Sequence, residues 1–234
     1  MKAIILAGGR GKRLRPITDY VPKPLIPIKN IPIIEWQIKY LKKYGVSEII
    51  ICSGYKSEMI ENYLNNKKLG IKITYSVENR PLGTGGAIKQ ASKKIKDNSF
   101  LVMNGDIITN IDLKKLVKKE NSIAAIQLKT KFGILQTDGN KIIKFDEKKE
   151  IKDTWMNAGI YYLGKEILKD LPKIGDIEKG LFPDYAKKGK LNTVKFTNSE
   201  WYSVDSFKDM EECSVNIEKI IKQSKNIMHQ FDVM

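Results

Sequence analysis

The stretch KAIILAGGRGKRLRP, residues 2–16, decides the fold, because an apolar run of strand length passes directly into a glycine-rich, basic loop. A glycine-rich turn after a strand is typical of parallel α/β sheets, which bind ligands at the carboxyl ends of their strands. Gly8, Gly9 and Gly11 leave backbone N–H groups uncovered, and Arg13 adds a planar fork of donors that matches phosphate oxygens. The loop predicts a triphosphate-binding site. The alternative is a tight turn with solvated charges, since the spacing matches neither GxGxxG nor GxxxxGK[ST].

Apolar runs of strand length recur along the chain, and helical patterns separate the early ones. One helix is predicted from Pro32 to Gly45 and another from Thr84 to Ile95, because their apolar residues recur three and four positions apart. Alternating strands and helices predict an α/β three-layer sandwich, in which helices cover both faces of a mostly parallel, mixed sheet. The predicted strands are 3–6, 48–52, 71–75, 100–103, 123–128, 142–145, 159–163 and 191–196.

The length of 234 residues suits one α/β domain, and no linker or repeat interrupts it. We predict a single domain over residues 1–225, with a last helix from about 206 to 222, and a C-terminal tail over 226–234. No apolar stretch approaches the roughly 18–20 residues of a membrane span, and the N-terminus lacks a signal-peptide layout, so we expect a cytoplasmic protein without a membrane partner. Cys52 and Cys213 lie outside any metal-binding pattern and are predicted to be free thiols.

The formal net charge of +15 raises the question of nucleic-acid binding. Nearly all of the positive charge is lysine, with only four arginines, and the lysines are spread along the chain at polar helix positions. A solvated surface explains this distribution better than a nucleic-acid groove does, so we expect no nucleic-acid partner.

Seven motifs narrow the function. In chain order they are AGGRGKRLRPIT (7–18), PKPLIPI (22–28), ENRPLGTGGA (78–87), NGD (104–106), FDEK (145–148), NAGIYYL (157–163) and WYSVDSFKD (201–209). Together they resemble the sugar-1-phosphate nucleotidyltransferase family over nearly the whole chain. The resemblance implies a Rossmann-like (GT-A-like) fold. It also implies an enzyme that joins a nucleoside triphosphate to a sugar 1-phosphate with Mg²⁺ and releases pyrophosphate.

The resemblance assigns the charged residues of these motifs to phosphates and metal. Arg13 and Lys23 match phosphate-binding cations, and Lys148 matches a lysine near the sugar phosphate and the α-phosphate. Asp106, at the carboxyl end of a predicted strand, is expected to hold Mg²⁺. The second metal carboxylate is expected at Asp205, two places later than in the common family pattern W-x-D, a form similar to the glucose-1-phosphate cytidylyltransferase branch.

The base-binding residues leave the choice of nucleotide open. The nucleotide site implied by the resemblance comprises Leu6, Ala7, Gly8, Gly9, Gly11, Lys12, Arg13, Glu78, Gly83 and Thr84. Lys12 replaces the usual hydroxyl residue and is expected either to contact phosphate as a point charge or to turn to solvent. Glu78 stands where uridine- and thymidine-using members often have glutamine. A carboxylate only accepts hydrogen bonds and matches the adjacent N1–H and N2–H₂ donors of guanine, so GTP is preferred, although the motif around Asp205 favours cytidine.

The sugar site implied by the resemblance comprises Gly133, Glu147, Lys148, Asn157 and Gly159. The segment around Glu78 is similar to heptose- and mannose-1-phosphate guanylyltransferases, so mannose or heptose 1-phosphate is the expected acceptor. Three alternatives stay open: a CTP-using enzyme, a UTP- or dTTP-using enzyme, and a non-catalytic nucleotide-sugar sensor. Family members often form homo-oligomers, which makes one possible here.

Overall fold

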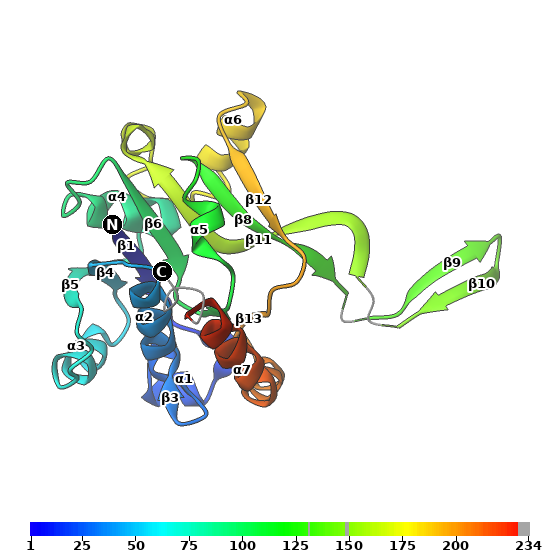
Figure 1. Ribbon diagram of the computed structural model, residues 1–234, viewed down its shortest axis with the longest axis horizontal. Helices are drawn as coiled ribbons and strands as arrows, with labels where there is room; N and C mark the ends of the chain where they lie inside the picture. The colour runs from blue at the N-terminus through cyan, green and yellow to red at the C-terminus, as the bar shows by residue number, and fades with distance from the viewer. Residues whose placement is uncertain (131, 148–149, 229–234) are drawn as a thin grey trace.

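A seven-stranded sheet forms the centre of the computed structural model, which describes residues 1–130, 132–147 and 150–228, with side chains to residue 221. The strand order is β12-β8-β11-β6-β1-β4-β5. The strand β11 is antiparallel to both neighbours, whereas the other pairs in this sheet are parallel. Helices pack on both faces of the sheet (Figure 1). The predicted α/β three-layer sandwich is therefore confirmed.

Each predicted strand has a counterpart in the structure. The strands are β1 (Lys2–Ala7), β2 (Pro27–Ile28), β3 (Ile31–Pro32), β4 (Glu48–Ser53), β5 (Lys72–Val77), β6 (Ser99–Asn104), β7 (Ile107–Thr109), β8 (Ser122–Lys129), β9 (Ile134–Asp138), β10 (Lys141–Asp146), β11 (Glu150–Gly164), β12 (Asn192–Phe196) and β13 (Trp201–Ser203). The α-helices are α1 (Ile17–Tyr20), α2 (Ile33–Lys43), α3 (Ser57–Asn65), α4 (Gly83–Ser92), α5 (Leu113–Leu116), α6 (Leu181–Lys187) and α7 (Phe207–Met228). Short 3-10 turns are η1 (Lys12–Leu14), η2 (Lys23–Leu25) and η3 (Lys165–Lys169).

The central strands are apolar on both sides because helices cover both faces of the sheet. In β1, Ala3, Ile5 and Ala7 pack into the core beneath α2, α3 and α5, whereas Ile4 packs into the core beneath α4 and α6. Successive residues of a strand point to opposite faces, so one continuous apolar run serves both cores. Burying each large aliphatic side chain contributes about 1.5–3 kcal/mol. This places the end of β1, and the loop that follows it, at the rigid middle of the sheet.

The helix α2 forms where the sequence predicts it. It begins after Pro32, its stripe of Ile34, Ile38 and Leu41 is fully buried, and it ends just before Gly45, which has a φ of 77°. A positive φ costs glycine little, so the chain turns sharply there toward β4. The stripe holds α2 against the sheet, and this packing fixes the helix behind the turn that follows β6.

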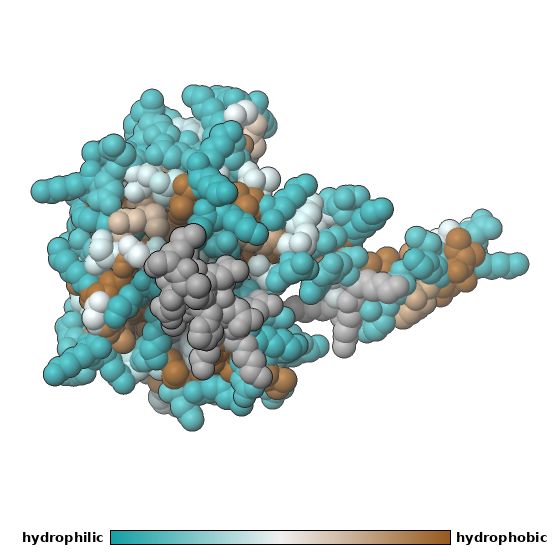
Figure 2. All heavy atoms as spheres, viewed as in Figure 1, coloured by the Kyte–Doolittle hydropathy of each residue, from teal (hydrophilic) through white to brown (hydrophobic). Residues whose placement is uncertain are grey.

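A two-stranded hairpin of β9 and β10 projects from the body (Figure 1). Leu135 pairs with Phe145 and Thr137 pairs with Ile142, so these side chains share one face, and the three hydrophobic ones are 47–61% exposed. Figure 2 shows hydrophobic atoms along this arm. The strand predicted at 159–163 covers only the end of β11. The first half of β11 is largely polar, so the hydropathy of the sequence does not reveal it.

The C-terminal helix α7 extends to Met228, which lies beyond residue 225, the predicted end of the domain. It packs on a third apolar cluster, in which Cys213 and Ile217 of α7 meet Leu14 and Ile26 from the start of the chain. Both cysteines are free and buried, as predicted. Among residues 1–130, 132–147 and 150–228, no helix combines the length and the apolar character that a membrane crossing requires.

Candidate active site

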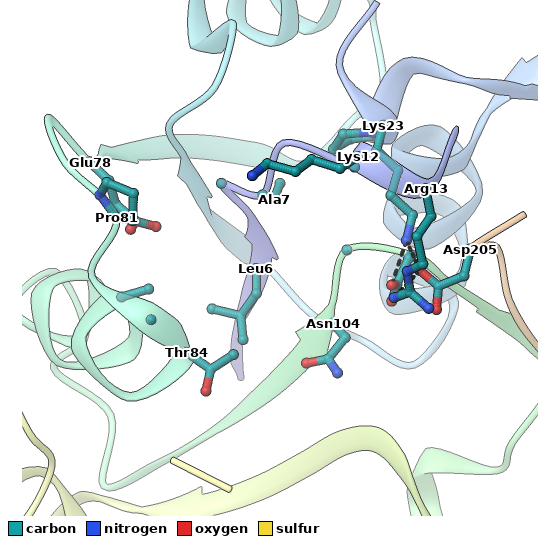
Figure 3. A pocket seen from close by; sticks show the side chains of 18 of the residues that line it. Leu6, Ala7, Lys12, Arg13, Lys23, Glu78, Pro81, Thr84, Asn104 and Asp205 are labelled. Atoms are coloured by element: carbon teal, nitrogen blue, oxygen red, sulfur yellow. Dashed lines mark hydrogen bonds and ion pairs between the residues drawn. The ribbon is translucent and has the colours of Figure 1, made fainter. Parts of the chain in front are cut away.

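A cavity of about 480 Å³ opens at the carboxyl end of β1, in the size range of small-molecule sites (Figure 3). Every residue of the predicted nucleotide site lines it, together with Lys23 and the two predicted metal carboxylates. The lining residues are Leu6, Ala7, Gly8, Gly9, Gly11, Lys12, Arg13, Leu14, Lys23, Pro24, Glu78, Pro81, Gly83, Thr84, Ala87, Asn104, Gly105, Asp106, Asp176 and Asp205. Segments far apart in sequence therefore converge where β1 ends.

The glycine-rich loop is shaped by two close approaches. Gly11 has a φ of 61°, a left-handed conformation that favours glycine, and its carbonyl accepts a hydrogen bond from Thr18 Oγ1 at 3.0 Å. Gly8 lies against Glu78, so that a β-carbon built on Gly8 would fall 2.7 Å from Glu78 Oε1. The loop then enters η1, which presents Lys12 and Arg13 to the cavity.

Asp106 is placed by a tight turn between β6 and β7. The N–H of Gly105 donates to the Leu6 carbonyl at 2.9 Å, and a β-carbon on Gly105 would collide with that carbonyl oxygen. Behind the turn, buried Gln37 of α2 donates through Nε2 to the carbonyls of Asn104 and Ile107, at 2.8 and 2.9 Å. Gln37 thus clamps the backbone on both sides of Asp106.

Two carboxylates meet at the ammonium group of Lys23. Its Nζ lies 2.7 Å from Asp106 Oδ2 and 2.7 Å from Asp205 Oδ1, and Arg13 Nη2 lies 2.9 Å from the same Asp205 oxygen. Ser203 Oγ donates to the other Asp205 oxygen at 3.1 Å, so the two side chains lie together. Burial alone would raise the pKa of Asp205, but Lys23 and Arg13 outweigh burial and hold the pKa below its usual range.

This cluster fits a divalent cation. Asp106 and Asp205 already share one positive charge, the Lys23 ammonium, which occupies the place between the two carboxylates that a small cation would take. Mg²⁺ is commonly bound by one or two carboxylates together with substrate phosphates. Within the described part of the chain, no group of three or more histidine, cysteine, aspartate or glutamate side chains is placed to hold a metal ion, so an ion at these two carboxylates would need further ligands from the substrate.

The opposite end of the cavity is formed by Glu78 and Pro81 (Figure 3). Burial raises the pKa of Glu78, and the N–H of Leu82, which donates to Oε2 at 3.0 Å, opposes this effect only in part. The N–H of Glu78 donates to the Ser53 carbonyl at 2.7 Å, which fixes its backbone at the edge of the sheet. The cavity therefore has a carboxylate acceptor at one end and a cluster of Lys23, Arg13 and carboxylates at the other.

The loop after Glu78 is held by the segment before α6. Gly83 has a φ of 71°, and a β-carbon there would lie 2.6 Å from the backbone of Gly175. The hydroxyl of Thr84 donates to Glu178 Oε2 at 2.5 Å and accepts from the Ile177 N–H at 2.9 Å. Both hydrogen bonds of this hydroxyl are made to the segment before α6. They hold the start of α4, and with it this wall of the cavity, in position.

The predicted sugar residues that the structure describes lie outside the lining of this cavity. Asn157 and Gly159 adjoin it, because a β-carbon on Gly159 would lie 2.7 Å from Asn104 Nδ2 and Asn104 lines the cavity. Gly133 and Glu147 lie together at the root of the projecting hairpin, where a β-carbon on Gly133 would be 3.1 Å from Glu147 Oε2. Lys148 lies outside the described residues, as does the only histidine, His229.

Other residues in and around the cavity are not predicted from the sequence. Asn104 lines the cavity, and its Oδ1 is buried without a hydrogen-bond partner among the described residues. Asp176 also lines the cavity, from the segment that holds Thr84. Asn104 carried a signal, because it begins the NGD motif at a strand end. Gln37, in contrast, lies within an amphipathic helix and has no local signal.

Comparisons with known proteins agree with this geometry. A family model described as nucleotidyl transferase matches residues 2–220. The chain is 44% identical over 176 residues to D-glycero-alpha-D-manno-heptose 1-phosphate guanylyltransferase of Campylobacter jejuni, a match that covers 73% of this chain and 79% of that protein. It is 40% identical over 177 residues to the protein of the same name from Aneurinibacillus thermoaerophilus, covering 72% and 77%. Probable mannose-1-phosphate guanylyltransferase 1 of Oryza sativa is 38% identical, with 80% of this chain and 56% of that protein covered.

Solved structures share the same fold. The crystal structure of HddC from Yersinia pseudotuberculosis superposes with a TM-score of 0.74 at 29% identity, covering 92% of this chain and 99% of that chain. The same protein complexed with GMP-PN gives a TM-score of 0.72 at 27% identity, with the same two coverages.

Proposed function

The chain belongs to the nucleotidyl transferase family, and we propose that it transfers GMP from GTP to mannose 1-phosphate or heptose 1-phosphate, with release of pyrophosphate. The membership, which rests on the match over residues 2–220 and on relatives 40–44% identical, confirms the prediction of a nucleotidyltransferase. The choice of base and sugar follows the similarity to heptose- and mannose-1-phosphate guanylyltransferases.

The observation that carries the proposal is the difference in charge between the two ends of the cavity. Glu78 at one end offers only acceptor oxygens, which suit the paired N1–H and N2–H₂ donors of guanine. At the other end lie Lys12, Arg13 and Lys23, which suit the phosphates of the same nucleotide. The glycine-rich loop lies between these ends, where backbone can approach the ligand closely. GTP is accordingly expected to span the cavity with its base at Glu78.

The reaction requires positioning and charge stabilisation. An oxygen of the sugar phosphate attacks the α-phosphorus of GTP in line, the bond from that phosphorus to the bridging oxygen breaks, and the electron pair leaves with pyrophosphate. A phosphate monoester loses its second proton with a pKa of about 6, so the attacking oxygen needs no general base near neutral pH. Arg13 and Lys23 are proposed to bind the negative charge that accumulates on the leaving group. Lys148 is proposed to neutralise the sugar phosphate.

We propose that Asp106 and Asp205 hold Mg²⁺ during this reaction. The ion, when bound, would neutralise phosphate charge and orient the α-phosphate. Lys23, now paired to both carboxylates, would then be available to the phosphates. The sugar ring is proposed to bind beside Asn157 and Gly159, with Gly133 and Glu147 approaching from the root of the hairpin.

The test is pyrophosphate release from GTP, CTP, UTP, dTTP and ATP, each with mannose 1-phosphate, heptose 1-phosphate and glucose 1-phosphate, with and without Mg²⁺. We expect turnover with GTP and a manno-configured sugar, and its loss in Asp106→Asn with the fold retained by circular dichroism. Preference for CTP would instead support the cytidylyltransferase similarity of the Asp205 motif. Nucleotide-sugar binding without turnover on any pair would favour the sensor alternative.

A further inference from the structure

Glu178 joins two parts of the site that are distant in sequence. It lies before α6, and its two carboxylate oxygens accept hydrogen bonds from hydroxyls on different elements. Thr84 Oγ1, at the start of α4, donates to Oε2 at 2.5 Å, and the Tyr161 hydroxyl, on β11, donates to Oε1 at 3.1 Å. An ionised carboxylate suits this place, because both partners are donors.

On the nucleotide side, the Glu178 segment fixes the loop that follows Glu78. Thr84 Oγ1 also accepts a hydrogen bond from the N–H of Ile177 at 2.9 Å. The Thr84 hydroxyl thus donates to Glu178 and accepts from Ile177, and both partners belong to this segment. The N–H of Gly175 donates to the Leu82 carbonyl at 2.8 Å, and the Gly175 carbonyl accepts from Gly85 at 2.9 Å. The orientation of this wall therefore depends on the chain from Gly175 to Glu178.

On the sugar side, the Tyr161 hydroxyl forms hydrogen bonds with both Glu178 and Asn157 and so links the two residues. The Tyr161 ring is fully buried and packs edge-on against Phe182, with 5.0 Å between ring centroids. Its hydroxyl accepts from Asn157 Nδ2 at 2.9 Å, and Asn157 Oδ1 accepts from the Gly159 N–H at 2.8 Å. Removing Glu178 would leave the Tyr161 hydroxyl without its acceptor, and the position of the oxygen to which Asn157 Nδ2 donates would then be less firmly fixed.

We propose that Glu178 is a positioning residue. Its carboxylate fixes the start of α4 at Thr84 relative to the part of β11 that contains Asn157, so that one side chain sets the geometry of both substrate sites. This inference rests on the proposed function for the identity of the two substrates. The relation of Thr84 to Asn157 through Glu178 rests on the hydrogen bonds themselves. Glu178 contacts neither substrate in this arrangement and acts only through its two hydroxyl partners.

The test compares KM values for GTP and mannose 1-phosphate among single variants. Thr84→Val should raise KM mainly for GTP, and Tyr161→Phe should raise it mainly for the sugar phosphate. Glu178→Ala should raise both KM values, each by about 5–20-fold, from one interaction of about 1–2 kcal/mol lost on each side. Adding Thr84→Val and Tyr161→Phe to Glu178→Ala should cost little more, because the shared carboxylate is already absent.

Tyr185→Phe is the matched control, since its hydroxyl donates to Asp170 at 2.5 Å and neither residue lines the cavity. It should leave both KM values unchanged. A change in only one KM in Glu178→Ala, or lost thermal stability with both KM values intact, overturns the inference. Absence of pyrophosphate release by the wild-type protein contradicts the proposed function instead. Calorimetry with GTP alone then decides the inference, because unchanged GTP affinity in Glu178→Ala overturns it.

Discussion

Gly8 and Glu78 are in such close contact that a β-carbon on Gly8 would fall 2.7 Å from the Glu78 Oε1 atom. The distance is shorter than side chains tolerate, so the absence of a side chain at Gly8 lets the carboxylate reach its place in the cavity wall. The loop after β1 and the loop after β5 are thereby set against each other at the edge of the sheet.

Gly8→Ala should displace the Glu78 carboxylate and weaken GTP use. We expect kcat/KM for GTP to fall about 10-fold or more, because one well-placed bidentate contact to a base is worth about 1–3 kcal/mol. Gly180→Ala is the control, since a β-carbon there finds its nearest neighbour at 3.8 Å, and it should behave as wild type. Equal activity of the two variants would exclude this role of Gly8.

Glu78→Gln should reduce GTP preference and stabilise the protein at neutral pH. A glutamine presents a donor beside an acceptor, which suits uracil or thymine better than guanine, so the GTP:UTP ratio of kcat/KM should fall about 10-fold. Because burial raises the pKa of Glu78, ionisation costs folding stability, and this cost appears as pH rises through the folded-state pKa. Tm of the variant should therefore exceed that of wild type at pH 7, and the difference should vanish near pH 4. A lower Tm at pH 7 would contradict this account.

Lys23→Met should leave Asp106 and Asp205 facing each other without their shared cation. We expect kcat to fall at least 100-fold and the free energy of unfolding at pH 7 to fall by on the order of 2 kcal/mol. Asp205 has a lowered pKa in the folded protein, so its stabilisation is present above its unfolded-state pKa and is lost as pH falls through the folded-state pKa. The stability difference between wild type and variant should shrink accordingly in acid.

Mg²⁺ provides a second measurement on the same variant. If the two carboxylates form a cation site, added Mg²⁺ should restore part of the lost Tm in Lys23→Met, whereas Na⁺ at equal ionic strength should not. Lys129→Met removes an exposed partner of the exposed Glu150 and should change stability by less than about 0.5 kcal/mol. A Lys23→Met protein with wild-type kcat would rule out this function of Lys23.

Gln37→Leu should loosen the turn that carries Asp106. The substitution removes both hydrogen bonds to the Asn104 and Ile107 carbonyls, at about 1 kcal/mol each, so unfolding free energy should fall by about 2 kcal/mol. The Mg²⁺ concentration for half-maximal activity should rise several-fold. Gln90→Leu, which also removes a side-chain amide that bridges two acceptors, is the control and should leave the Mg²⁺ requirement unchanged.

The sequence predicts the sheet, and the residues that it selects for the nucleotide line one cavity, for one physical reason. The residues there follow strands whose apolar composition is unmistakable, such as β1 and β6, and the carboxyl ends of parallel strands meet at one edge. Arg13, Asp106 and Glu78 therefore line one cavity, with Glu78 at the opposite end from the two others. The pairing of Lys23 with both carboxylates depends on long-range packing and has no local signal.

The polar half of β11 and the strand β9 are not predicted because their sequences are largely polar and contain no long apolar run. Residues 150–155, EIKDTW, alternate irregularly and pair with β8 across register shifts. Thr84 lines the cavity as its motif implies, but the bonds of its hydroxyl to Glu178 and Ile177 have no signal in the motif. Such internal use of a polar group depends on a segment nearly a hundred residues away, which single-chain patterns do not report.

The order of the site residues along the chain has a consequence for synthesis on the ribosome. Lys23 emerges 182 residues before Asp205, its partner in the cation cluster. Until α7 has been made, Leu14 and Ile26 lack the apolar cover that Cys213 and Ile217 later supply. A chain interrupted before Asp205 would therefore expose this unfinished core and lack one carboxylate of the cluster. Such a product is expected to bind chaperones and to be degraded, so activity is expected only after translation has passed α7.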